Sequence, residues 1–410
     1  MGNTRQKVVI IGHGYTSRLA VIRSVAQIGS EVTVIVMTNY KRDGKTLNTK
    51  KPIDCYSKYV SHVYYCYAKD EEGLIQLLLD KCSDSQQKVV IIPDSDFSAA
   101  AIDRNQKRLK EHFLFPHIRH TSGAIIEWMD KVRQKQLARE IGLNVASSCV
   151  IDINDRKYVI PSEVRYPCFT KALATVNGGG KRIFRRCNNE TELRNALDLA
   201  ASISDMQVLV EDFKKIETEY AVVGFSDGKE VIIPGIIQIL EMAHGGHFGV
   251  ACLGKVMPVN GFEELVAKFK QFMQHVGFVG VFDIDFYQSE GKMYFGELNL
   301  RFGGSGYAVT KMGVNLPGML VKTVVGEKID GMKETLTSTA TFVNERMCMD
   351  DWYSGFISIN EYKNLLERAN ISFVQDDADS TPQKHFSLFF LIRYIKKLAK
   401  KYIKKPKISQ

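Results

Sequence analysis

Unbroken apolar runs alternate with a helical pattern near the start of the chain. The runs KVVIIG at 7–12 and EVTVIV at 31–36 flank a helical pattern with Leu19, Ile22 and Val25 on one face. Continuous apolar runs are typical of parallel strands buried on both faces, and a helix between them completes a βαβ unit. The run KVVIIP at 88–93 predicts a further strand of this kind. These patterns predict an α/β, Rossmann-like domain over residues 1–118.

After residue 118 the pattern changes, and helices and strands of mixed type follow one another. A helix and a strand precede the run YPCFTK, which leads into a Gly-rich turn and a basic return strand, KRIFRR. Further strands and a long helix follow. This order predicts two α+β lobes over 119–330, one of them at about 150–210. We expect a C-terminal extension at 331–383 and a basic amphipathic tail at 384–410.

Composition restricts the class of protein further. The chain is 45% hydrophobic and has eight cysteines without CxxC spacing, and no apolar run approaches the roughly 20 residues of a membrane span. We therefore expect a folded cytoplasmic protein with reduced thiols. The formal net charge is +9, and residues 384–410 hold nine basic residues and no acid, so the rest of the chain is neutral. This distribution argues against a nucleic-acid partner.

Two groups of small or acidic residues follow predicted strands of the first domain. Gly12 and Gly14 begin a GxGxxG pattern, but Ser17 replaces the third glycine and no acid follows the second strand. A tight turn without a nucleotide is therefore favoured, and a dinucleotide site stays open as the alternative. Asp94 and Asp96 end a strand where open α/β sheets bind ligands, although helix capping explains such acids equally well.

The segment GELNLRFGGSG at 296–306 places an acid, an amide and a base on alternate positions: Glu297, Asn299 and Arg301. Side chains at alternate positions share one face of a strand. A buried strand would ordinarily carry apolar residues on such a face. The pattern therefore predicts a functional surface.

The partner strand of this segment lies directly upstream. Two strand-like runs flank residues 289–291, which predicts a three-residue hairpin loop with glycine in its last, left-handed position. If the loop is centred on Glu290, Asp283 lies opposite Glu297, with side chains roughly 5 Å apart on one face. Asp285 points the same way.

Facing carboxylates repel each other unless a cation lies between them. Oxygen ligands from Asp283, Glu297 and Asn299 suit Mg²⁺, with Mn²⁺ as an alternative and Asp285 as a spare ligand. Because Mg²⁺ completes its shell with substrate phosphates and water, the site calls for a nucleotide. The alternative is an exposed hairpin face with ordinary polar residues.

Candidate phosphate-binding groups precede the hairpin. Lys131 and Lys171 supply ammonium groups, and a flexible loop whose N–H groups can close over phosphates follows them. The loop consists of Gly178, Gly179, Gly180 and Lys181.

The order of these motifs resembles the ATP-grasp superfamily. The motifs are MDK, YPCFTK, the Gly-rich loop, VLVEDF followed by EY, FDIDF and GELNLR, and the resemblance covers residues 5–325. It resembles in particular the ligase halves of the carbamoyl-phosphate synthase large chain and the D-aspartate ligases. It implies a Rossmann-like pre-ATP-grasp domain followed by a two-lobed α+β ATP-grasp domain. Asp283 stands where some relatives have Gln or Glu, and Lys131 and Lys171 stand where the synthase has Arg.

The resemblance also implies a role for each candidate residue. Lys131 and Lys171 would contact the phosphates of ATP, and 178–181 would be the lid. The segment Glu211, Asp212 and Phe213 would bind adenine, and Glu219 would hold the ribose. Asp283, Glu297 and Asn299 would bind Mg²⁺. Arg301 would face the acyl phosphate, and Arg301 and Lys171 are the expected catalytic residues.

Phosphoryl transfer to a carboxylate makes an acyl phosphate that an amine can attack, and it needs mainly positioning and charge neutralisation. We therefore expect a carboxylate–amine ligase that forms ADP. A ligase with a non-amide product, a catalytically silent nucleotide-binding protein and a nicotinamide-dependent oxidoreductase remain alternatives. For the acceptor site, family likeness points to Asp94, Asp96, Arg301 and a loop with His244 and His247. A homodimer stays open.

The C-terminal tail is not required by the ligase fold. On a helix its apolar stripe consists of Leu388, Leu391, Ile395, Leu398, Tyr402 and Ile403. Such a helix is too short and too charged to span a bilayer, so we expect it to lie on an anionic membrane with Phe386, Phe389 and Phe390 buried there. The acceptor would then be a cell-envelope precursor at the inner face of the membrane. A helix docked on the protein, or a nucleic-acid contact, are the alternatives.

Overall fold

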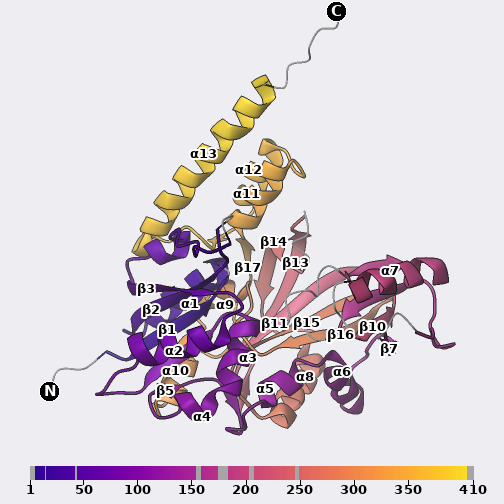
Figure 1. Ribbon diagram of the computed structural model, residues 1–410, viewed down its shortest axis with the longest axis horizontal. Helices are drawn as coiled ribbons and strands as arrows, with labels where there is room; N and C mark the ends of the chain where they lie inside the picture. The colour runs from indigo at the N-terminus through magenta and orange to yellow at the C-terminus, as the bar shows by residue number, and fades with distance from the viewer. Residues whose placement is uncertain are drawn as a thin grey trace, which may run out of the picture.

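The computed structural model describes residues 5–13, 15–41, 44–153, 158–173, 183–202, 207–244 and 249–403. Within these residues the strands form sheets of five, four and nine strands (Figure 1). The loop at 178–181 and His247 lie outside the described residues, and so does Gly14.

The N-terminal sheet is parallel and has the order β3-β2-β1-β4-β5. Its strands are β1 (Lys7–Gly12), β2 (Glu31–Thr38), β3 (Val60–Tyr67), β4 (Val89–Pro93) and β5 (Phe113–Leu114). Val8 and Ile10 of β1 pack in one core with α1 (Tyr15–Ala26), whereas Val9 and Ile11 pack in another with α2 (Glu71–Lys81). Both faces of β1 are therefore covered, which explains its unbroken apolar run.

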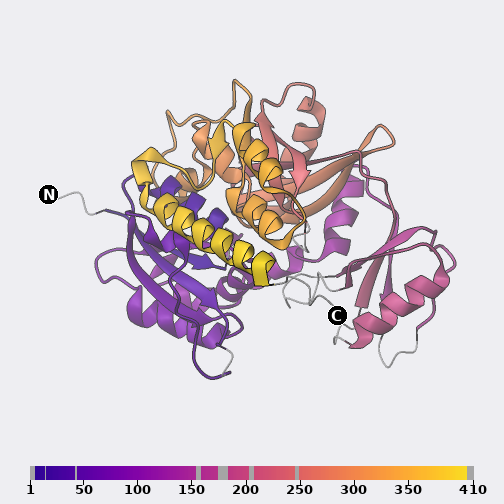
Figure 2. The same cartoon turned by 90° about the horizontal axis from the view of Figure 1, so that it is seen from above.

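The four-stranded sheet is antiparallel and forms a separate lobe at one side of the molecule (Figure 2). Its order is β7 (Ser148–Asp152), β10 (Gln207–Asp212), β8 (Cys168–Ala172) and β9 (Arg185–Cys187). Helix α7 (Glu190–Ser202) covers it through Leu193 and Leu197. The predicted strand and basic return strand pair here as β8 and β9.

The nine-stranded sheet forms the centre of the molecule. Its main path is β16 (Lys292–Asn299), β15 (Phe278–Ser289), β11 (Thr218–Asp227), β13 (Ile236–Met242), β14 (Ala251–Met257), β17 (Ala340–Val343) and β18 (Ile371–Ser372). β12 (Val231–Ile232) pairs with β11, and β6 (His117–Ile118) pairs with β15.

Alternate residues of β15 enter two different environments. Phe282, Ile284 and Phe286 pack against α8 (Glu263–Val276). Val281 packs on the other face with α9 (Gly306–Lys311), α10 (Leu316–Val324) and residues of β1. Asp283 and Asp285 follow Val281 on that second face, so strand alternation directs both acids toward the side of the N-terminal domain.

The structure corrects the predicted hairpin register. β15 and β16 are joined by a two-residue turn, Glu290 and Gly291, both with positive φ, and not by three residues. An irregularity beside Asp285 then shifts the register again, so that Asp285 lies opposite Glu297 and Asp283 lies opposite Asn299. The predicted pairing of Asp283 with Glu297 was therefore wrong.

Helices α11 (Glu345–Ser354), α12 (Ile359–Glu367) and α13 (Thr381–Ile403) complete the C-terminal part. α13 docks on the body, packing against α11 and the short helix η1 (Ile53–Tyr56). The described helices include none long and apolar enough to cross a membrane. The expectation that Phe386, Phe389 and Phe390 face a membrane was wrong, because these three side chains pack against the core beneath α13.

Candidate active site

The acidic face of the hairpin is the centre of the candidate site. Asp285 and Glu297 face each other across β15 and β16, and Asp283 and Asn299 form the next pair. The Asn299 amide Nδ2 lies 3.4 Å from Asp285 Oδ2. The four side chains predicted as metal ligands or spare ligand therefore lie on one face, although in a different pairing from the predicted one.

Burial makes this arrangement unfavourable without a cation. It raises the pKa of Asp283 to about 7, and burial together with repulsion from Asp283 and Glu297 raises the pKa of Asp285 well above its usual value. Asp283 Oδ1 is buried and accepts no hydrogen bond from the residues that the structure describes. A divalent cation beside this carboxyl group would stabilise its ionised form, which burial disfavours.

In the described ranges no group of three or more His, Cys, Asp or Glu side chains is arranged to hold a metal ion. Mg²⁺ typically binds through one or two carboxylates together with substrate phosphates and water. Asp283, whose buried Oδ1 lacks a hydrogen-bond partner among the described residues, and Asn299 opposite it are oxygen donors of the kind that such a partial site uses.

Two lysines predicted to contact phosphates converge on the acidic face from different elements. Lys131, the first residue of α6 (Lys131–Glu140), lies 2.7 Å from Glu297. Burial opposes ionisation of Glu297, but the Lys131 ammonium outweighs it and keeps the pKa of Glu297 below its usual value. Lys171 of β8 lies 2.7 Å from Glu211.

Lys135 is a buried member of this cluster that the sequence analysis missed. It forms an ion pair with Glu211, so that this carboxylate contacts both Lys135 and Lys171. Although burial opposes ionisation, the two ammonium groups lower the pKa of Glu211 to about 2. The spacing of Lys135 four residues after Lys131 was the available signal, because such residues share one helix face.

Gln134 holds α6 against β16. Its amide donates to the Leu298 carbonyl and accepts from the Leu298 N–H, each at 2.9 Å. Leu298 follows Glu297, so this double contact fixes Lys131 relative to the acidic face. Sequence reasoning did not single out Gln134, whose partner lies 164 residues away.

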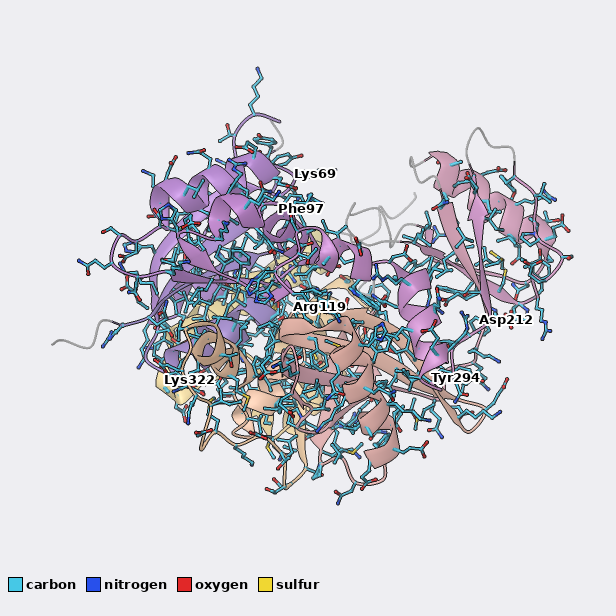
Figure 3. All side chains as sticks on the ribbon, turned by 90° about the horizontal axis from the view of Figure 1, so that it is seen from below. Lys69, Phe97, Arg119, Asp212, Tyr294 and Lys322 are labelled. Atoms are coloured by element: carbon cyan, nitrogen blue, oxygen red, sulfur yellow. The ribbon has the colours of Figure 1, made fainter. Side chains whose placement is uncertain are left out.

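The segment predicted to bind adenine lies at the end of β10. The N–H groups of Asp212 and Phe213 donate to the carbonyls of Ser147 and Pro167, both at 2.9 Å. Figure 3 labels Asp212 on the four-stranded lobe and Phe97, the neighbour of Asp96, on the N-terminal domain at the other side of the molecule. Because these two N–H groups already donate to backbone carbonyls, an adenine contact at this segment would use other groups.

Glu219, the predicted ribose ligand, belongs to the same sheet as the acidic face. It is paired in register with Tyr287 of β15, two positions along from Asp285 and on the same face. Burial raises its pKa.

Asp94, Asp96 and Arg301 meet where the N-terminal domain contacts the hairpin. Arg301 Nε lies 2.8 Å from Asp96 Oδ1. Burial raises the pKa of Asp94 to about 7, although Arg18, Ser17 and Arg301 counteract it. The structure therefore brings these three predicted acceptor residues into one charged group.

The glycine turn of β1 is engaged in internal contacts. Ser17 Oγ lies 2.9 Å from Asp94 Oδ2, and the buried Arg18 donates to the Gly12 carbonyl and pairs with Asp54. A Cβ atom at Gly12 would lie 2.8 Å from the Cβ of Asp94. Gly12 therefore permits close packing of β1 against the start of the segment after β4.

His244 does not join the acidic face through any described contact. Its backbone N–H and its ring Nδ1 contact Asp351 of α11, with the ring at 3.0 Å, and the ring stacks on Phe356. His247, the other histidine of this predicted loop, is among the residues that the structure does not describe.

A family model matches the part of the chain that contains this site. Residues 130–332 match the family model of the carbamoyl-phosphate synthase L chain, ATP binding domain. Residues 130–332 of the chain form a domain of the ATP-grasp superfamily. The matched residues contain Lys131, Lys171 and the whole acidic hairpin of this ATP-grasp domain.

Curated relatives match over part of their length. The chain is 24% identical over 204 residues to the carbamoyl phosphate synthase large chain of Gemmatimonas aurantiaca, covering 49% of this chain and 18% of that one. It is 28% identical over 188 residues to the same protein of Campylobacter jejuni, covering 44% and 17%. The matched segment thus spans about a fifth of these relatives.

Solved structures show the same fold at low identity. The biotin carboxylase domain of Hydrogenobacter thermophilus 2-oxoglutarate carboxylase, in complex with MgADP, ADP and bicarbonate, has a TM-score of 0.61 at 20% identity, covering 83% of this chain and 74% of that one. The L-amino acid ligase of Bacillus licheniformis has a TM-score of 0.60 at 14% identity, covering 83% and 80%. N5-carboxyaminoimidazole synthetase of Staphylococcus aureus, complexed with ADP, has a TM-score of 0.58 at 18% identity, covering 83% of each chain.

Proposed function

We propose that this protein is an ATP-dependent carboxylate–amine ligase. A carboxylate oxygen attacks the γ-phosphorus of ATP and ADP leaves; the amine then attacks the acyl carbon, loses a proton and displaces phosphate. The observation that carries this proposal is the buried acidic face of the hairpin, approached by Lys131 and Lys171, inside the segment that matches the ATP-binding family model. Neither lysine nor acid needs to act as a covalent nucleophile in this reaction.

Asp283, Glu297 and Asn299 would hold Mg²⁺, or Mn²⁺ in its place, with Asp285 beside them. The metal, when bound, neutralises charge on the phosphates. Lys131 and Lys171 would exchange their present carboxylate partners for phosphate oxygens. Because Glu211 keeps Lys135 as a second partner, it would not be left as an unpaired buried charge when Lys171 turns away.

The nucleotide would lie between the two sheets of a two-lobed ATP-grasp domain, next to a Rossmann-like pre-ATP-grasp domain. Glu211 to Phe213 would contact adenine, Glu219 the ribose, and residues 178–181 the phosphates. Neighbours of this fold solved with ADP or MgADP support this assignment.

Arg301 would face the acyl phosphate and its tetrahedral adduct, and Asp96 would hold its guanidinium in place. An acceptor amine would approach from the side of Asp94. We infer that the donor is an amino acid and the acceptor a cell-envelope precursor, with the protein acting in the cytoplasm at the inner face of the membrane. The fold neighbour named L-amino acid ligase supports the choice of an amino acid.

A phosphate-release screen tests this function. Purified protein with ATP and Mg²⁺ is offered amino acids, and separately bicarbonate, each with amines and amino sugars. Phosphate release that needs both substrates, with ADP as the nucleotide product, supports the ligase. ATP turnover with neither substrate dependence nor ADP as product would contradict it.

Thermal stabilisation separates the remaining alternatives. Mg²⁺ with ATP should raise the unfolding temperature, because a ligand that binds only the native state stabilises it. Stabilisation by NAD in place of ATP would support the oxidoreductase hypothesis, and stabilisation by ATP without any turnover would support a silent nucleotide-binding protein.

A further inference from the structure

Helix α13 is attached to the body by one face only. Phe386 is buried, and Phe390 stacks on Trp352 and Tyr362 with ring centroids 5.0 and 5.2 Å apart. Arg393 pairs with Asp350, and Lys397 donates to a backbone carbonyl of α11. These contacts recur along the helix over three turns, so α13 is held as a rigid element and not as a free tail.

The opposite face of α13 is apolar and exposed. Its residues follow three-to-four spacing and form one stripe, which we call the α13 stripe: Leu388, Leu391, Ile392, Ile395 and Leu398. Their exposed fractions are 54%, 51%, 43%, 56% and 41%. Contiguous exposed apolar surface of this kind is rare on monomeric proteins and marks an interaction site. At 100° per residue, the stripe lies about half a turn from Phe386 and Arg393.

Exposed basic side chains accompany this stripe. Lys384 and Lys396 are exposed and, at 100° per residue, lie on or beside the stripe, whereas Arg393 and Lys397 belong to the docked face. The helix contains no acidic residue. Two exposed lysines from the N-terminal domain approach its first turns: Lys50 Nζ lies 5.9 Å from the Phe389 ring, and Lys51 Nζ lies 4.7 Å from the Tyr56 ring, which stacks on His385.

Figures 1 and 2 show α13 on the outside of the molecule, across the N-terminal domain and the pair α11 and α12. The body lies on one side of the helix and the α13 stripe on the other. A flat surface could therefore contact the whole stripe without displacing the docked face.

We propose that the α13 stripe is a docking surface for an anionic lipid bilayer. The helix lies in the plane of the membrane, the five aliphatic side chains enter the boundary between headgroups and acyl chains, and the lysines contact the headgroup phosphates. Long lysine side chains at the border of an apolar stripe can reach the headgroups from there. This inference does not depend on the proposed ligase activity.

Charge favours the bilayer over a second copy of the chain. Two α13 stripes in contact would bring the basic side chains of both copies together with no acid on either helix to pair them. Like charges so placed repel each other, whereas an anionic membrane attracts them.

Vesicle flotation with the full chain tests the proposal. The protein is mixed with vesicles of phosphatidylcholine and phosphatidylglycerol, or of phosphatidylcholine alone, at low and high salt. We expect binding to the anionic vesicles that weakens at high salt. Leu391→Glu combined with Ile395→Glu should reduce this binding by at least about tenfold, because it removes two apolar side chains from the contact and adds two negative charges that the anionic headgroups repel.

Two further variants make the result specific. Val159→Glu, at an apolar residue that is 85% exposed elsewhere, should bind like the wild type. Lys50→Glu with Lys51→Glu leaves the aliphatic side chains of the stripe in place and reverses two nearby charges, so it should weaken binding to anionic vesicles more than to phosphatidylcholine vesicles. Absence of binding by the wild type, or equal binding by the stripe variant, would overturn the proposal. So would a concentration-dependent dimer that the stripe variant abolishes, if the wild type ignores vesicles.

Discussion

A single missing side chain at Gly303 makes room for one of the proposed metal ligands. A Cβ atom there would lie 2.1 Å from Asp283 Oδ2, whereas a Cβ atom at Gly304 would have nothing within 4 Å. We predict that Gly303→Ala displaces the Asp283 carboxylate and lowers kcat/KM for ATP by about 10- to 100-fold, since small misplacements in such sites are costly. Gly304→Ala is the matched control and should behave like the wild type in the same ADP-formation assay. Equal rates for both variants would exclude a role for the position of Asp283.

Glu297 is the acid most directly tied to a lysine of the site. Glu297→Gln keeps the size of the side chain but removes the charge that pairs with Lys131 and would hold the metal. We predict that ADP formation falls by about 100-fold or more while the unfolding temperature changes little. Glu290→Gln, in the turn of the same hairpin, should retain wild-type activity. A wild-type rate for Glu297→Gln at saturating Mg²⁺ would refute the site assignment.

The buried carboxyl of Asp94 should make stability depend on pH. Burial raises its pKa from an ordinary value of 3.8 to about 7, against the opposing effects of Arg18, Ser17 and Arg301. Between these values the native state binds more protons than the unfolded state, so the free energy of unfolding decreases as pH rises. Asp94→Asn does not titrate, and we expect it to be more stable than the wild type at pH 8 by on the order of 1 kcal/mol, with a smaller difference at pH 5. Calorimetry at the two pH values checks this; a larger gain at pH 5 would contradict it.

Among the elements, the hairpin shows what sequence patterns can and cannot predict. Alternation placed Asp283, Asp285, Glu297 and Asn299 on one face, and they lie there. The predicted pairing of these residues was wrong. It depends on the two positive φ values of the turn and on the irregularity near Gly296, where a Cβ atom would lie 2.8 Å from the Asp285 carbonyl. A glycine signals close approach, but the sequence does not say which backbone approaches it.

The sequence pattern also did not predict which residues of distant elements form ion pairs with each other. The ion pairs of Arg301 with Asp96 and of Lys135 with Glu211 join residues 205 and 76 positions apart in the chain. Asp96, Arg301 and Glu211 were identified from local patterns or family likeness, whereas Lys135 was not. Tertiary packing determines which charges meet, and no local periodicity carries that information.

The sequence predicted that helix α13 is amphipathic, but it did not predict which face of the helix packs against the body. Its aromatic residues dock on the body, and its aliphatic residues face outward. We predict that Phe386→Ala, at a buried position, raises hydrogen exchange of the α13 amides by at least about tenfold, because loss of a buried aromatic ring costs on the order of 2 kcal/mol or more. Leu388→Ala, at an exposed position on the opposite face, should leave exchange unchanged. Equal exchange in the two variants would show that Phe386 does not anchor the helix.

At the scale of the whole molecule, the N-terminal domain and the ATP-grasp domain share a core. Residues of β1, β2 and α1 pack in one cluster with residues of β11, β15 and α10. Arg23 of α1 pairs with Asp379 near the start of α13 at 2.9 Å, so the C-terminal part is tied to the first domain as well. This continuity holds Asp94 and Asp96 beside Arg301, so that the proposed acceptor site between the domains would be preorganised.

The central claim is that this site activates a carboxylate as an acyl phosphate, and the path of oxygen tests it most directly. A pool of amino acids labelled with ¹⁸O in the carboxyl group is incubated with the protein, ATP, Mg²⁺ and amines, and the products are analysed by mass spectrometry. We predict that one labelled oxygen appears in the released phosphate and that the nucleotide product is unlabelled ADP, because the carboxylate oxygen bonds to the γ-phosphorus before the amine displaces phosphate. Label in AMP, or phosphate without label, would contradict the account.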